Sequence, residues 1–141
     1  MSNRPILDHF EAEESMPELY SRELIVGFTV LFSVLFGTIW YVYNLRTVGK
    51  WHLAIVVTAL AILYFGLSQM VASYLSDLLF LPTLAFNLFA GLLLVGPLWK
   101  AQIGQFSFRR KSPLYPLLLA ILIALGWLLA KHAQYTNLSL I

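Results

Sequence analysis

The sequence predicts an all-α membrane protein with four transmembrane helices. Three observations support this fold class: 60% of the 141 residues are hydrophobic, only 11% are charged, and the apolar residues form four long stretches. Soluble domains carry about 25% charged residues, so most of this chain must be solvated by something other than water. Helices are favoured over a β-barrel because the apolar stretches do not alternate polar and apolar residues.

The first predicted span covers 24–43, a stretch of 20 residues without charge. At about 1.5 Å per residue, this length matches a hydrocarbon core about 30 Å thick. Residues 1–21 form an acidic tail, in which Ser15 and Glu18 have the spacing of a capping box and predict a helix start near residue 15. We therefore divide the chain into a tail at 1–21 and a four-helix transmembrane domain at 22–141.

The second and third predicted spans cover 52–75 and 78–99, and the fourth covers 113–130. Only two residues separate the second span from the third, so a segment at 71–81 that lies on the membrane surface is an alternative. Pro97 cannot donate a hydrogen bond to the helical turn before it. It therefore predicts a kink near the polar edge of the third span.

The two halves of the chain share a pattern that allows a second description of this fold. Gly37 precedes Arg46 by nine residues, and Gly91 precedes Lys100 by the same interval. Two tandem helical hairpins in parallel repeat, related by an axis along the membrane normal, would produce this pattern. Biased composition also produces such matches, so four unrelated spans remain the alternative.

The distribution of charge predicts an orientation. Loops 44–51 and 100–112 contain six of the nine Lys and Arg residues, and the predicted topology places all seven Asp and Glu residues on the opposite side. Basic residues near span ends mark the cytoplasmic side of a membrane. We therefore predict a multi-pass protein of the bacterial inner membrane with both termini outside the cytoplasm.

Two sets of residues are candidates for contacts. The basic loop places aromatic rings beside three consecutive cations, which predicts binding to anionic phospholipid or to an acidic partner segment; its residues are Phe106, Phe108, Arg109, Arg110 and Lys111. Small or polar residues within the spans predict close helix packing, and they are Ser33, Gly37, Asn87, Gly91, Gly96, Pro97, Ala120 and Ala124. Setting the topology and packing the helices internally are the simpler roles for these two sets.

The functional prediction is an accessory or scaffold subunit of a membrane complex, without enzymatic activity. We assign no catalytic residue, no cofactor and no metal site, and we expect no nucleic-acid partner because the basic residues lie at span ends rather than along a groove. The expected partners are the lipid bilayer and either another membrane protein or further copies of the chain. The alternative is a small oligomeric transport or permeability protein.

Overall fold

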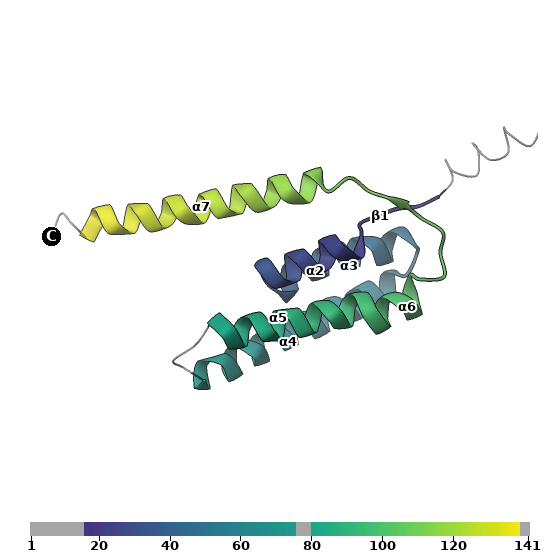
Figure 1. Cartoon of the computed structure of the whole chain (residues 1–141), viewed down its shortest axis with the longest axis horizontal. Helices are drawn as coiled ribbons and strands as arrows, with labels where there is room; N and C mark the ends of the chain where they lie inside the picture. Colours follow the sequence, from purple (N-terminus) through teal and green to yellow (C-terminus); the bar gives the residue numbers. More distant parts are fainter. Residues whose placement is uncertain (1–15, 76–79, 139–141) are drawn as a thin grey trace, which may run out of the picture. The chain divides into compact units, whose positions relative to one another are not determined.

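The computed structural model describes residues 16–75 and 80–138 of the chain. It is mostly helical, which confirms the helical class, and it divides into two compact units, Met1–Lys111 and Ser112–Ile141 (Figure 1). The second unit contains one helix, α7 (Leu114–Leu138). The first unit contains, in chain order, β1 (Glu18–Leu19), α2 (Arg22–Leu31), α3 (Val34–Thr47), α4 (Trp51–Tyr74), α5 (Phe80–Leu93), the π-helical segment η2 (Leu94–Leu98), α6 (Trp99–Gln102) and β2 (Arg109–Arg110).

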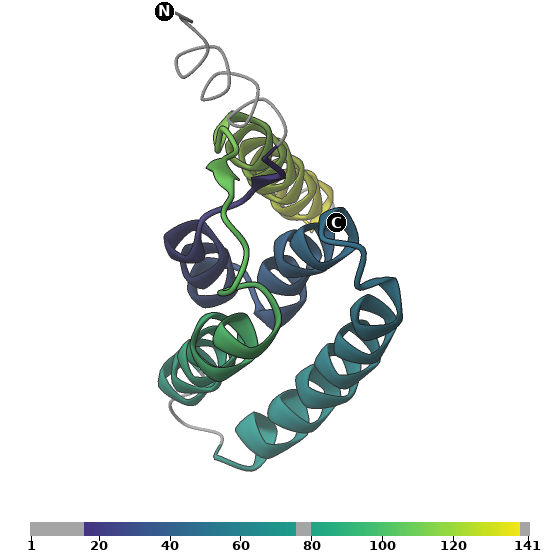
Figure 2. The same ribbon diagram turned by 90° about the vertical axis from the view of Figure 1, so that its right-hand side faces the viewer.

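The prediction of a single helix over 24–43 is wrong. The stretch forms two helices, α2 and α3, which pack side by side as an antiparallel hairpin (Figures 1 and 2). Ser33 separates them with an extended backbone (φ 179°, ψ 168°), and its carbonyl accepts the N–H groups of Phe36 and Gly37. At 10 residues, α2 is about 15 Å long, which is half of a hydrocarbon core about 30 Å thick.

The surroundings of Thr29 show how α3 and α5 can lie so close to α2. The Thr29 side chain is fully buried on α2, and its hydroxyl donates to the carbonyl of Ile25 at 2.7 Å. A Cβ added at Gly37 on α3 would overlap the Thr29 hydroxyl, and one at Gly91 on α5 would come within 3.3 Å of the Thr29 Cβ. The two glycines therefore allow both α3 and α5 to approach α2 closely.

The start of the first helix also differs from the prediction. Ser21 is the N-cap of α2, and its hydroxyl accepts the N–H of Leu24 at 3.2 Å. Glu18, the predicted end of a capping box, lies instead in strand β1, and Ser15 lies outside the described residues. Residues 16–21, the described part of the chain before α2, thus form no helix and include the extended strand β1.

The second and third predicted spans are close to helices of the structure. Trp51–Tyr74 and Leu81–Gln102 are both long and apolar enough to cross a membrane, whereas the apolar part of α7, Leu114–Ala130, is shorter. In the most apolar part of each long helix, the buried share is only 17% for Trp51–Tyr74 and 22% for Leu81–Gln102. The core helix of a soluble protein is mostly buried. Helix α4 continues to Tyr74 and α5 begins at Phe80, and the middle of the alternative surface segment, 76–79, lies outside the described residues.

Pro97 lies inside the third predicted span as expected, and the irregularity there is a π-helical segment. Residues Leu94–Leu98 form η2, between α5 and α6. A proline lacks the N–H that would continue the α-helical hydrogen bonds, and a widened turn is one common response.

The prediction of two tandem hairpins in parallel repeat is wrong. Three helices, α2, α3 and α4, precede residue 75, where the repeat requires two. Within the first unit, α2 packs against both α3 and α5, and α4 packs on α3 (Figure 2). Gly37 and Gly91, the two glycines that match in the sequence pattern, both lie against Thr29, one from α3 and the other from α5. Close packing against Thr29 therefore explains why each position carries a glycine.

A smaller buried cluster of Val34, Ala61 and Ala90 joins α3, α4 and α5, but most of the largest fully buried side chains of the first unit gather at one end, which we call the polar end. It consists of β1, the start of α2, the last turns of α3, the start of α4, α6 and β2. Large side chains that are fully buried gather there, namely Leu19, Ile25, Tyr41, Asn44, Leu45, Trp99 and Ile103. Away from this end, α4 and α5 expose an apolar flank, which we define by Ile55, Val56, Leu60, Ile62, Leu63, Leu67, Met70, Val71, Leu81, Leu88, Phe89 and Leu92.

Candidate functional site at the polar end

Strands β1 and β2 join the segment before α2 to the basic loop. They pair in parallel, with Glu18 opposite Arg109 and Leu19 opposite Arg110. The N–H of Arg109 donates to the carbonyl of Pro17 at 3.0 Å, and that of Lys111 donates to Leu19 at 2.8 Å. The prediction that these two segments lie on opposite sides of the protein is therefore wrong, because the α2–α3 hairpin returns the chain to the end where it started.

Asn44 fixes the end of α3 to the same segment. Its side chain is fully buried; the amide oxygen accepts the N–H of Tyr20 at 2.8 Å, and the amide nitrogen donates to the Tyr20 carbonyl at 2.9 Å. These two bonds satisfy both backbone groups of a buried residue, as a neighbouring strand would. The sequence places Asn44 at the start of the polar loop 44–51, and no local pattern indicates its hydrogen bonds with Tyr20.

Lys111 completes a cluster of aromatic rings and a cation. Its ammonium group donates to the Tyr43 hydroxyl and lies 4.3 Å from the centroid of the Tyr43 ring and 5.5 Å from that of Tyr20. The hydrogen bond to Tyr43 raises the pKa of Lys111. Tyr20 also contacts the Trp40 ring edge to face, with 5.0 Å between the centroids. The cluster therefore favours a permanent positive charge at this position.

A second cluster surrounds Trp99, which is fully buried on α6. The guanidinium carbon of Arg22 lies 5.2 Å from the centroid of the Trp99 ring, and Phe108 packs edge to face on that ring at 5.8 Å. Arg109 and Glu18 form an ion pair at 3.9 Å nearby, with 68% and 51% of their side chains exposed. An ion pair this exposed adds little stability, so aromatic packing dominates here.

Lys50 links the turn between α3 and α4 to the end of α6. Its ammonium group donates to the backbone carbonyl of Gln102 at 2.7 Å and to the Gln102 side chain at 3.2 Å, and it lies 5.4 Å from the centroid of the Phe106 ring. The turn itself requires Gly49, which has a positive φ of 78°.

The predicted contact residues of the basic loop thus have identifiable surroundings. Phe106, Phe108, Arg109 and Lys111 contact other parts of the first unit, and Arg110 is exposed in β2. The loop is held against the helices, with the guanidinium groups of Arg109 and Arg110 at its surface. Its binding to lipid or to a partner stays a prediction.

The remaining predicted packing residues have varied positions. Ser33 forms the hairpin turn, nothing lies near enough to Gly96 to require a glycine, and Ala120 and Ala124 are four residues apart on α7. Asn87 is buried, but the interhelical hydrogen bond at this level is donated by the Tyr64 hydroxyl to the Phe86 carbonyl at 2.7 Å.

At the polar end, hydrogen bonds and aromatic contacts hold separate segments of the chain together, and exposed basic side chains form a cationic surface. In the part of the chain that the structure describes, no group of three His, Cys, Asp or Glu residues could hold a metal ion. The fold and this end define a mostly helical protein with two helices long and apolar enough to cross a membrane. Comparisons with protein-family models, with curated proteins and with solved structures find no match to the chain.

Proposed function

We propose that this chain is a multi-pass protein of the bacterial inner membrane that serves, without enzymatic activity, as an accessory or scaffold subunit of a membrane complex. The main support for the proposal is the apolar flank of α4 and α5, together with the basic side chains of the polar end. The flank provides a surface for other membrane helices, and the polar end holds the unit in a fixed orientation.

The apolar flank is much larger than the scattered apolar residues of a soluble surface. On α4, Leu60 and Leu63 are 58% and 60% exposed, and on α5 Phe89 is 56% exposed. A helix that is apolar around its whole circumference is typical of a membrane span. In a membrane, such side chains are covered by lipid or by another membrane helix.

The charge of the polar end supports an orientation with this end in the cytoplasm. Among the residues that the structure describes at this end, two are acidic, Glu18 and Glu23, and seven are basic, namely Arg22, Arg46, Lys50, Lys100, Arg109, Arg110 and Lys111. Basic residues close to span ends remain on the cytoplasmic side. In this proposal the segment before α2 is cytoplasmic, which reverses the orientation that the sequence predicted for it.

In this orientation the α2–α3 hairpin enters the membrane from the cytoplasmic side and returns to it. Non-helical backbone at membrane depth is tolerated where protein surrounds it. The close contacts of Thr29 with Gly37 and Gly91 provide such surroundings for the hairpin below its tip. In this arrangement α2 packs between α3 and α5, and the exposed side of α4 is free to meet a partner.

The test is purification of the tagged chain in a mild detergent, followed by native mass measurement. We expect a partner protein in fixed stoichiometry, and we expect the double variant Leu60→Ala, Leu63→Ala to lose it. Leu31→Ala is the matched control, because Leu31 is 78% exposed but lies at the hairpin tip rather than on the flank. Recovery of the chain without any partner would contradict the proposal, and a homo-oligomer that conducts solutes across liposomes would support the transport alternative.

A further inference from the structure

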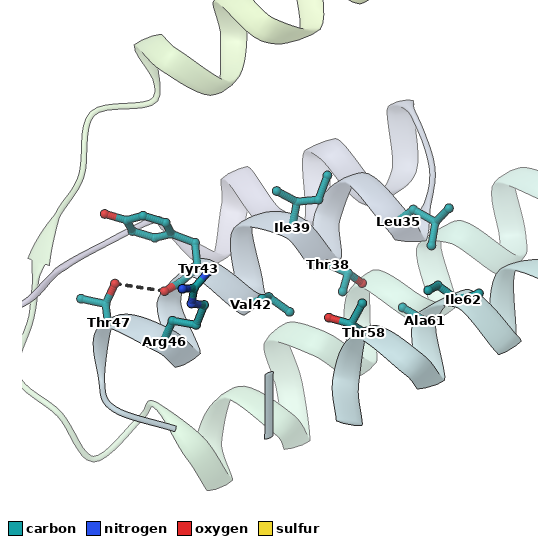
Figure 3. Close-up of a pocket in the computed structure, with 10 residues that line it drawn as sticks. All are labelled: Leu35, Thr38, Ile39, Val42, Tyr43, Arg46, Thr47, Thr58, Ala61 and Ile62. Atoms are coloured by element: carbon teal, nitrogen blue, oxygen red, sulfur yellow. Dashed lines mark hydrogen bonds between the residues drawn. The ribbon is translucent and has the colours of Figure 1, made fainter. Parts of the chain in front are cut away.

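An open groove runs between α3 and α4, with a volume of about 730 Å³ (Figure 3). It continues into a second hollow of about 400 Å³, since both are lined by Val42, Arg46, Thr58 and Ile62. A volume of this size lies within the range of pockets that bind organic ligands, about 300–1,000 Å³. The two helices contact each other elsewhere along their length, so the groove belongs to the packed first unit.

The walls of the groove are mostly aliphatic, although Thr38 and Tyr43 also line it. Leu35, Ile39 and Val42 line it from α3, and Ala61 and Ile62 line it from α4 (Figure 3). Thr58 also lines it, but its hydroxyl donates to the carbonyl of Ala54 at 2.8 Å within α4. The surface presented to an occupant is therefore suited to a hydrocarbon chain.

The groove has a cationic mouth. Arg46 and Thr47 lie at one end of it, and Leu35 lies towards the other (Figure 3). Arg46 is exposed, and its guanidinium group forms no hydrogen bond or ion pair with any residue that the structure describes. Trp51, 54% exposed, lines the adjoining hollow at the start of α4, where an amphipathic ring suits the level of lipid headgroups.

The length of the groove matches one leaflet of a bilayer. Arg46 and Leu35 are eleven residues apart on one helix, which corresponds to roughly 17 Å at 1.5 Å per residue. Half of a hydrocarbon core about 30 Å thick is about 15 Å. An acyl chain whose headgroup lies beside Arg46 would therefore extend along the whole groove.

We propose that this groove binds an anionic glycerophospholipid, with the phosphate on Arg46 and one acyl chain between α3 and α4. The inference rests on the proposed membrane location. The basic loop lies next to the groove, since Lys111 donates to Tyr43, which lines it, but Arg109 and Lys111 already contact Glu18 and Tyr43, whereas Arg46 is exposed at the mouth. A second copy of the chain fits the groove less well, because a symmetric contact would bring two Arg46 side chains to the same depth.

The experiment is native mass spectrometry of the full chain released from nanodiscs that contain equal parts phosphatidylglycerol and phosphatidylcholine. We expect one retained phosphatidylglycerol per chain. Arg46→Gln should lower its retention about fivefold, the effect of one interfacial cation. The matched control Lys100→Gln, at an exposed basic residue outside both the groove and the predicted lipid contacts, should leave it unchanged. Thr58→Phe, at an exposed position of the groove wall, should lower the retention of both lipids.

Several outcomes would overturn the inference. Equal losses for Arg46→Gln and Lys100→Gln would show a general surface charge effect, and full retention by Thr58→Phe would show that no acyl chain occupies the groove. A dimer without bound lipid would show that a second copy fills it. Alkaline carbonate extraction of the same variants separates this failure from that of the proposed function, because a chain outside the membrane is released into the soluble fraction.

Discussion

The polar end and the apolar flank of the first unit are stabilised in different ways. At the polar end, Asn44 and Trp99 are fully buried, and hydrogen bonds and aromatic contacts join segments that are far apart in the chain. Along the flank, Leu60 and Leu63 are more than half exposed and contact little of the chain itself. The difference indicates that internal packing at the polar end specifies the fold, while the flank depends on what surrounds the protein.

The largest expected effect comes from Gly37, where α3 approaches α2. Gly37→Ala would place a methyl group on the Thr29 hydroxyl and within 2.9 Å of the Ile25 carbonyl oxygen. We expect a loss near the upper end of the range of about 1–3 kcal/mol that overpacking causes. The measurement is the free energy of unfolding in a mixed-detergent titration.

Gly66→Ala is the matched control for this substitution. Nothing lies within 4 Å of a Cβ at Gly66 on α4, so alanine should raise stability there, by at most about 1 kcal/mol. If the two glycines responded alike, the contrast between a tightly packed hairpin and an open flank would be wrong.

Asn44 tests the hydrogen bonds of the polar end. Asn44→Ala removes the two hydrogen bonds to the buried N–H and carbonyl of Tyr20, so we expect a loss of about 2 kcal/mol and faster exchange of the Tyr20 amide hydrogen. Thr47→Ala is the control, because the Thr47 hydroxyl donates to the Tyr43 carbonyl on an exposed surface. Slow exchange of the Tyr20 amide hydrogen in the Asn44 variant would argue against a stabilising role for these two hydrogen bonds.

The ion pair between Glu18 and Arg109 should contribute less. A double-mutant cycle with Glu18→Gln and Arg109→Gln should give a coupling free energy below about 1 kcal/mol that falls further in high salt, because both side chains are mostly exposed. A coupling of several kcal/mol that did not change with salt would mean that this pair, rather than Asn44 and the aromatic rings, holds the strands together.

The flank should give the smallest effect on the chain by itself. Leu60→Ala in lipid nanodiscs, without a partner, should change the free energy of unfolding by less than about 0.5 kcal/mol, because the side chain is 58% exposed. A loss as large as that for Asn44→Ala would show that the flank is packed within the chain.

The sequence was sufficient to predict the helical class, two helices of membrane-crossing length and the irregularity at Pro97. These features depend on local composition and on the geometry of proline. It was also sufficient to select Gly37 and Gly91, although their common contact with Thr29 depends on the three-dimensional arrangement.

The sequence was not sufficient to predict the hairpin. A stretch of 20 uncharged residues has the length of a span, and Ser33 alone does not mark a turn. The fold-back depends on contacts between residues far apart in the chain, such as Asn44 with Tyr20, which no local pattern reveals. The start of α2 was accessible, since Ser21 followed by Glu23 in the first turn is a helix-start signal as good as the one at Ser15.

Labelling of single cysteines tests the central claim most directly, because the chain has no cysteine of its own. The variants are Glu18→Cys before the hairpin, Arg110→Cys in β2 and Leu75→Cys after α4, treated in intact cells with a reagent that does not cross the membrane. We expect positions 18 and 110 to be protected, because both lie at the cytoplasmic polar end, and position 75 to be labelled. Labelling of position 18 together with protection of position 110 would mean that the chain crosses the membrane between residues 24 and 43 and would contradict the hairpin.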